Sequence, residues 1–181
     1  MSKNEHPHNC SMCGTAMTLQ WNENRRREVC PACGWIRYEQ LKLGAGAIIE
    51  RDGHLLLLRR AHDPWQGTWN IPSGYVEADE DPARAAEREA LEESGLQVRV
   101  TRLVDALFFD DDPRGNGLHL IYACDIVGGD LRNSHESTAL RFFAPAEIPA
   151  DLCGAGHARA IRSWQAARRS LTTDHRPPTE F

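Results

Sequence analysis

Three glutamates stand at helical spacing near the middle of the chain: Glu89, Glu92 and Glu93. A helix projects such residues within an arc of about 100°, so their carboxylates face one region of space. Clustered carboxylates repel one another, and a cation between them offsets that repulsion. Hard oxygen ligands select Mg²⁺ or Mn²⁺ rather than zinc. Taken alone, the cluster leaves a solvated acidic helix face as the alternative.

The helix that would position these glutamates has clear end signals in the sequence. Asp81 can cap its start, Pro82 suits the first helical position, and Gly95 suits the left-handed residue that follows the last turn. We therefore predict a helix over Pro82–Ser94.

Strand-like segments lie on both sides of this helix in the sequence. Two apolar runs, Leu43–Glu50 and His54–Arg60, are separated by a turn sequence and predict a strand, turn and strand. Gly44 and Gly46 within the first run indicate that another group comes close to the backbone there. The other predicted elements are the strands Val98–Phe109, Leu118–Val127 and Leu140–Phe143 and a basic amphipathic helix, Gly156–Arg169.

Cysteine spacing predicts a second metal site of a different kind. Four of the six cysteines form two close pairs, Cys10/Cys13 and Cys30/Cys33. Each Cys-x-x-Cys unit offers two thiolates, and two units close a tetrahedron around a structural Zn²⁺. The alternative is a redox or disulfide pair, which a chain without secretory features disfavours. Cys124 and Cys153 lack such partners, and we expect them to be small buried hydrophobic residues.

Length and charge bound the organisation of the chain. Its 181 residues suffice for one catalytic domain and a small appendage. We predict a zinc ribbon with a flexible N-terminus over residues 1–40, the main domain over 41–171 and a disordered tail over 172–181. The formal net charge of −5 argues against nucleic-acid and membrane binding, which need an excess of Lys and Arg. With no signal peptide or membrane span, we expect a cytoplasmic protein, and a homodimer stays open.

A longer motif contains the three glutamates. The order Gly, five residues, Glu, seven residues, Arg-Glu, apolar, any, Glu-Glu, any, Gly, apolar is that of the Nudix box. Every fixed position is filled, by Gly74, Glu80, Arg88, Glu89, Ala90, Glu92, Glu93, Gly95 and Leu96. With the ribbon in front, the chain resembles zinc-ribbon Nudix hydrolases, a group that contains NADH, ADP-ribose and FAD pyrophosphatases. The resemblance implies an α/β fold, a Nudix α/β/α sandwich with a mixed β-sheet, preceded by the small ribbon.

The resemblance also implies a small-molecule nucleotide substrate and roles for the motif residues. The three glutamates would hold Mg²⁺ or Mn²⁺ together with the backbone carbonyl of Ser73, and those ions would bridge the substrate phosphates and acidify a bound water. Glu77 would add an outer ligand. Glu80 and Arg88 would form the ion pair that fixes the loop over the helix, with Gly74 and Gly95 in support. Ser73 itself stands where the family most often has Gly.

The general base and the substrate contacts are less well defined by the resemblance. Many relatives carry a Glu two residues before a strand Arg that Arg141 resembles, but the residue there is Ala139. Glu136 is the nearest substitute for the base, and an ordinary loop carboxylate is the alternative. The candidates for substrate binding are Arg60 on a phosphate and Trp69 and Phe108 on a base; strand-end and core packing are the alternatives.

The activity implied is cleavage of the pyrophosphate linkage of a nucleoside diphosphate derivative to AMP and a second monophosphate. NADH pyrophosphatases carry a Ser-Gln-Pro-Trp type motif that Leu107–Pro113 lacks, which favours ADP-ribose or FAD over NADH. Two rival functions remain. A non-hydrolysing nucleotide sensor conflicts with the intact glutamate set. A nucleic-acid module, for instance one that removes NAD caps from RNA, would use Arg25, Arg26, Arg27 and Arg37, but the acidic balance opposes it.

Overall fold

The computed structural model describes residues 8–173. The chain divides into two compact units, Met1–Leu41 and Lys42–Phe181, and each is described here by itself. The predicted flexible N-terminus and, from residue 174 onwards, the predicted disordered tail lie outside the described residues. Residues 172 and 173 belong to the last helix instead of the tail.

The first unit is a small antiparallel sheet of three strands. These are β1 (Thr18–Asn22), β2 (Arg25–Val29) and β3 (Ile36–Arg37), in the order β1-β2-β3. Its hydrophobic cluster consists of Met17 and two cysteines, with Trp35 packed against them. So few apolar residues cannot hold a domain together without a cross-link or a metal.

The second unit is built on a mixed β-sheet. Its main path runs β10-β5-β4-β9-β8, with β6 paired to β5 and β7 paired to β4. The strands are β4 (Lys42–Arg51), β5 (His54–Arg60), β6 (Trp69–Asn70), β7 (Ser73–Tyr75), β8 (Leu96–Phe109), β9 (Gly117–Gly129) and β10 (Ser137–Phe143). The pairing of β4 with β9 is parallel and the other pairings are antiparallel.

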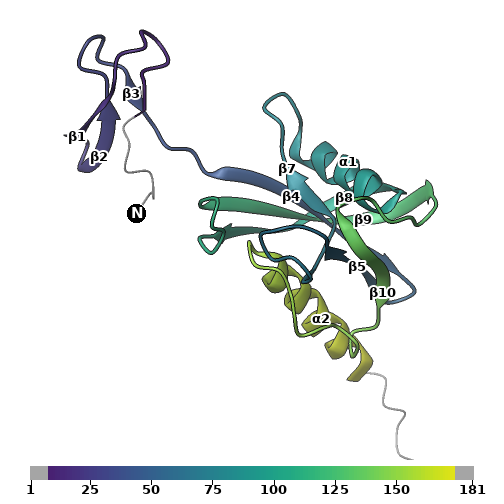
Figure 1. Cartoon of the computed structure of the whole chain (residues 1–181). Helices are drawn as coiled ribbons and strands as arrows, with labels where there is room; N and C mark the ends of the chain where they lie inside the picture. The colour runs from purple at the N-terminus through teal and green to yellow at the C-terminus, as the bar shows by residue number, and fades with distance from the viewer. Residues whose placement is uncertain (1–7, 174–181) are drawn as a thin grey trace, which may run out of the picture. The chain divides into compact units, whose positions relative to one another are not determined.

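One helix covers each face of this sheet (Figure 1), so the predicted α/β/α sandwich is confirmed. The first is α1 (Pro82–Ser94) and the second is α2 (His157–Thr173). Alternate residues of β4 and β5 face opposite layers, as the period of two of a strand requires. Ile48, Leu55 and Leu57 pack with α2, whereas Ala47, Ile49 and Leu56 pack on the α1 side.

The ends of α1 follow the predicted signals. The side chain of Asp81 accepts a hydrogen bond from the N–H of Ala83 (2.9 Å), and Pro82 opens the helix. Gly95 closes it in the left-handed conformation, with φ 74°, and its N–H donates to the carbonyl of Leu91. Three buried alanines on the inner face let the helix lie close to β4. They are Ala85, Ala86 and Ala90.

A carboxylate of β4 anchors the later turns of the second helix to the sheet. Glu50 accepts hydrogen bonds from Nε1 of Trp164 (2.8 Å) and Nε of Arg168 (2.8 Å). The helix therefore docks through its later turns as well as through the apolar residues that it buries. Neither of the described helices is both long and apolar enough to cross a membrane.

Candidate active site and zinc site

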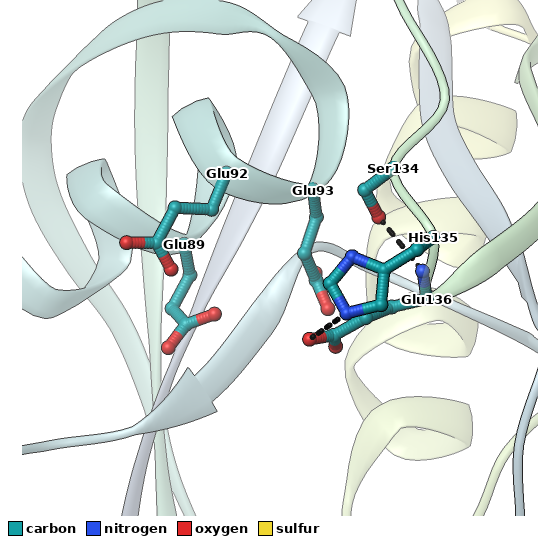
Figure 2. A pocket seen from close by; sticks show the side chains of 6 residues that line it. All are labelled: Glu89, Glu92, Glu93, Ser134, His135 and Glu136. Carbon is teal, nitrogen blue, oxygen red and sulfur yellow. Dashed lines mark hydrogen bonds and ion pairs between the residues drawn. The ribbon is translucent and has the colours of Figure 1, made fainter.

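The glutamates of α1 face a cavity of about 300 Å³ (Figure 2). Glu93 is buried, the side chain of Glu89 is 13% exposed, and that of Glu92 is 58% exposed. The cavity wall is made by Glu89, Glu92, Glu93, Ser134, His135 and Glu136. The helical spacing thus brings the three glutamates to one side of a common space.

Glu93 is held in an environment that disfavours its own charge. Burial raises its pKa to about 8, opposed by a hydrogen bond that the N–H of Ser73 donates to Oε2 (2.8 Å). The charges of Glu89 and Glu136 raise this pKa further, and Arg60 lowers it. A divalent cation would reverse this penalty, and a donor set of carboxylate oxygens suits Mg²⁺ or Mn²⁺. The residues present therefore fit such an ion.

Arg88 ties the loop before the helix to the helix itself. Its guanidinium donates to both oxygens of Glu80 (2.9 and 2.8 Å) and to the carbonyl of Tyr75 (3.1 Å). It also donates to Oε1 of Glu89 (2.6 Å), and burial of Glu89 raises the pKa of that carboxyl while Arg88 lowers it. Glu80 and Arg88 thus form an ion pair between the loop and the helix.

Gly74 lies directly against one of the carboxylates. A Cβ at this position would collide with the carboxylate of Glu89, since Oε1, Cδ and Oε2 all lie within its contact distance. Because β7 passes so close to α1, any side chain at position 74 would push the carboxylate of Glu89 out of its place.

Glu136 closes the cavity from the side opposite to α1. Its carbonyl accepts from the N–H of Ala61 (2.8 Å) and its own N–H donates to Oγ of Ser134 (3.2 Å), which fix the loop before β10. Figure 2 shows Glu136 and His135 pointing toward Glu93. Sequence reasoning missed Ser134 and His135 as lining residues, and their position next to Glu136 was the only available signal.

Of the remaining predicted site residues, Arg60 lies close to the carboxylates, whereas Phe108, Glu77 and Trp69 do not line the cavity. Arg60 lies near Glu93, where its charge lowers the pKa of that carboxyl, and its Nε donates to the carbonyl of Pro64 (3.0 Å). Phe108 is 48% exposed on β8. Glu77 is exposed and is not part of the cavity wall. Trp69 packs edge-on against Phe143 at 4.8 Å within the core, so its ring is engaged in packing.

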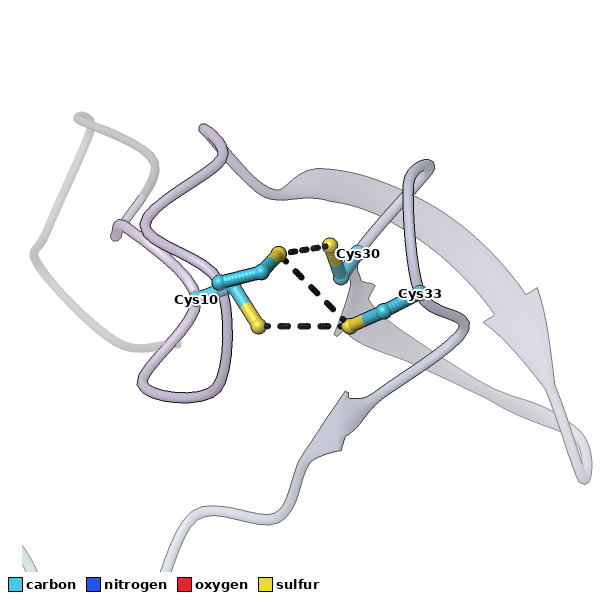
Figure 3. Close-up of side chains that lie close together, drawn as sticks. Cys10, Cys30 and Cys33 are labelled. Carbon is cyan, nitrogen blue, oxygen red and sulfur yellow. Dashed lines mark hydrogen bonds between the residues drawn. The ribbon is translucent and has the colours of Figure 1, made fainter.

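The cysteines of the first unit converge on one point (Figure 3). Their sulfurs all lie within 4.8 Å of one another, with Cys10 to Cys33 at 3.6 Å and Cys13 to Cys30 at 3.5 Å. Zn–S bonds of about 2.3 Å in a tetrahedron place sulfurs roughly 3.8 Å apart, so the cluster fits a zinc ion. Hydrogen bonding by Thr15 lowers the pKa of the Cys13 thiol to about 6, whereas the pKa of Cys33 is raised to about 12, because the lowering by the backbone of Trp35 is outweighed by hydrogen bonds with the neighbouring sulfurs. Cys124 and Cys153 are buried, as expected.

The fold and the site together define a Nudix domain. The NUDIX domain profile matches residues 40–165, and the profile described as Nudix N-terminal, the zinc ribbon of that family, matches residues 9–39. The chain therefore belongs to the Nudix family and carries the N-terminal ribbon of that family.

Relatives of known name differ in substrate. The chain is 34% identical over 103 residues to the ADP-ribose pyrophosphatase of Methanocaldococcus jannaschii, covering 56% of this chain and 61% of that one. It is 33% identical over 122 residues to the NAD-capped RNA hydrolase NudC of Edwardsiella ictaluri, covering 67% and 45%. Both matches span less than two thirds of the relative. A NUDIX hydrolase structure from Nitrosomonas europaea superposes with a TM-score of 0.79 at 28% identity, covering 90% and 93%.

Proposed function

We propose that this Nudix hydrolase cleaves the pyrophosphate linkage of a nucleoside diphosphate derivative, with ADP-ribose or FAD preferred to NADH. The products would be AMP and a second monophosphate. The observation that carries the proposal is the cavity of carboxylates around Glu93, where burial and neighbouring charges leave a place for a cation. The similarity to a protein named ADP-ribose pyrophosphatase and the absence of the NADH motif support the choice of substrate.

In this proposal Glu89, Glu92 and Glu93, with the carbonyl of Ser73, hold Mg²⁺ or Mn²⁺. The bound ion supplies charge neutralisation at the phosphoryl oxygens and acidifies water. Glu136, across the cavity, accepts the proton of the attacking water. The water oxygen bonds to phosphorus, and the bond from phosphorus to the bridging oxygen breaks. Arg60 adds positive charge beside the phosphates.

The test is a comparison of kcat/KM for ADP-ribose, FAD, NADH and a nucleoside triphosphate with Mg²⁺ and with Mn²⁺. We expect ADP-ribose or FAD to be cut faster than NADH and much faster than the triphosphate, with AMP among the products by chromatography. A preference for NADH would overturn the choice of substrate. Binding of nucleotide without any hydrolysis would favour a sensor.

A second candidate is removal of NAD caps from RNA. One feature of the ribbon favours it: Trp21 is 75% exposed and pairs directly across the hairpin with Arg26. An exposed indole beside a guanidinium can stack an unpaired base and attract its phosphate. The cross-strand register brings together an aromatic ring and an arginine that are separated along the sequence. Hydrolysis of NAD-capped RNA at a higher kcat/KM than ADP-ribose would favour this candidate.

A further inference from the structure

A pair of buried histidines lies beneath the start of β7. His119 of β9 and His157, the first residue of α2, meet edge to face with ring centroids 4.7 Å apart and planes at 71°. Both residues are buried. Nε2 of His157 lies 3.3 Å from Oγ of Ser73, which opens β7. A hydrogen bond therefore links α2 to the strand that borders the carboxylate cavity.

Ser73 is held from both faces of the sheet. Its N–H donates to Glu93 of α1 (2.8 Å), while its hydroxyl contacts His157 of α2. The carbonyl of the same residue is the backbone ligand in the proposed metal site. The contact of the Ser73 hydroxyl with His157 thus helps to orient two backbone groups, the N–H of Ser73 that binds Glu93 and the carbonyl of Ser73 in the proposed metal site.

The histidine pair is itself tightly located. Nδ1 of His119 lies 3.1 Å from the carbonyl of Ala155, and since a carbonyl only accepts, this nitrogen carries the hydrogen. On β4, a Cβ at Gly46 would lie 2.7 Å from Nε2 of His119. This contact explains the close approach that the glycines of β4 predict. Burial lowers the pKa of His119 to about 4 and that of His157 well below its usual range, so both rings stay neutral at pH 7.

We propose that His157 is a positioning residue: through the hydroxyl of Ser73 it fixes the two peptide groups that hold Glu93 and the catalytic cation. The inference rests on the proposed function for the identity of that cation. Glycine, the residue most common at this position in the family, has no side chain to anchor and leaves the backbone freer. In this chain the serine supplies a hydroxyl, and the first residue of α2 supplies its partner.

A merely structural role would have a different signature. Contacts other than that of His157 also dock α2, because Trp164 and Arg168 bind Glu50 of β4. Trp164→Phe keeps the ring packing and removes the hydrogen bond to Glu50, so it loosens α2 far along the helix from Ser73. This variant is the matched control for a loss of helix docking.

The experiment measures Mn²⁺ affinity by calorimetry without substrate, together with kcat and KM on the best pyrophosphate. Ser73→Ala and His157→Leu each remove the contact, and His157→Gln keeps a polar atom at a similar reach. We expect Ser73→Ala and His157→Leu to lose about 10- to 100-fold in Mn²⁺ affinity or kcat, with KM unchanged. Losses of this size are typical when a residue that hydrogen-bonds a metal ligand is removed. His157→Gln should recover most of the loss, and Ser73→Ala combined with His157→Leu should be no worse than the worse single variant.

Three results would overturn the inference: wild-type Mn²⁺ affinity and kcat in His157→Leu, an equal loss in His157→Leu and His157→Gln, or the same loss in Trp164→Phe. Its failure is separable from failure of the proposed function. If the wild type binds Mn²⁺ but cuts no pyrophosphate, the hydrolytic proposal is wrong, while the affinities still decide the role of His157.

Discussion

At the scale of single residues, Glu93 is a buried carboxyl group whose proposed role as a metal ligand requires it to be ionised. The residue is 4% exposed, yet the hydrogen bond that it accepts from the N–H of Ser73 stabilises the ionised form. Burial outweighs that bond and raises its pKa to about 8. The carboxylate is therefore a costly feature of the metal-free protein that a bound cation turns into a ligand.

Glu93→Gln should nearly abolish hydrolysis while the protein stays folded. Glutamine keeps the shape of the side chain but removes the charge that holds the cation, and the loss should be roughly 10²- to 10³-fold in kcat, by analogy with removed oxyanion donors. Steady-state kinetics with saturating Mg²⁺ measure it. Glu87→Gln is the control, since Glu87 lies on the same helix but binds the N–H of Val100 on β8 (2.9 Å). Equal loss in both variants would mean that the helix, not the metal site, had been damaged.

The residues of this site differ in how far sequence alone could identify them. The glutamates of α1 share one helix, so their spacing fixes their common direction. Glu136 could be only a candidate, because the chain between Ser94 and Glu136 must first return through two long strands. His157 could not be predicted at all. Its contact with Ser73 spans 84 residues and depends on how α2 docks.

At the scale of elements, the closeness of β7 to α1 sets the most stringent requirement in the site. Gly74 pairs with Ala45 of β4, and this pairing leaves no room between the strand and the carboxylate of Glu89. A methyl group there must displace either the strand or the glutamate.

Gly74→Ala should therefore lower kcat by roughly 10²-fold, which is the scale of one lost electrostatic contact. The thermal unfolding midpoint should stay close to that of the wild type. The matched control is Gly128→Ala on β9, where the nearest atom to a new Cβ is the flexible end of Gln97 at 3.0 Å. Kinetics and thermal melts of both variants decide. Full activity of Gly74→Ala would show that Glu89 can move without loss of the metal.

Local signals predicted the helix α1 better than the sheet around it. Asp81, Pro82 and Gly95 act within one turn of the helix ends, so its predicted range was correct to the residue. The second helix begins at His157 and continues past Arg169 to Thr173, further than predicted. The two- and three-residue strands β6 and β7, and the parallel pairing of β4 with β9, depend on contacts between distant segments and leave no periodicity in the sequence.

At the scale of the whole molecule, the two units are held by different means. The second has apolar clusters on both faces of its sheet, whereas the first has Cys10, Met17 and Cys30 with Trp35. A metal that crosslinks four thiolates can replace the missing core.

Cys30→Ser should lose the zinc, about one equivalent per chain, while the second unit keeps its thermal transition and its Mg²⁺-dependent hydrolysis. Elemental analysis after dialysis and calorimetry measure the two effects. Cys124→Ala serves as the control, because Cys124 is buried against β4 and β8 of the second unit. Zinc retained by Cys30→Ser, or absent from the wild type purified without chelator, would contradict the ribbon.

The two buried histidines should each contribute less to the stability of the fold in mild acid than at pH 7. The unfolded chain protonates a histidine near pH 6.5, but burial lowers the pKa of folded His119 to about 4. At this site the unfolded state therefore binds more protons between these values, so the contribution of His119 to the free energy of unfolding falls as pH drops from about 6.5 toward 4. His157 acts in the same direction. The raised pKa of Glu93 acts in the opposite direction in the metal-free protein.

Urea titrations of the chelator-treated protein at pH 7 and pH 5 test this dependence. The gap in unfolding free energy between the wild type and His119→Gln should narrow as pH falls, because only the wild type carries that buried imidazole. In His62→Gln, which changes an exposed histidine, the unfolding free energy should vary with pH as it does in the wild type. A gap that is constant with pH would mean that His119 does not resist protonation.

The contact at Gly74 also bears on how such a chain can change over evolutionary time. A methyl group there would strike Glu89 and would enter none of the apolar clusters of the described residues. A single codon change at this position would thus slow the proposed hydrolysis roughly 100-fold and leave the core of the domain intact, so selection can adjust the rate of the reaction separately from the stability of the fold.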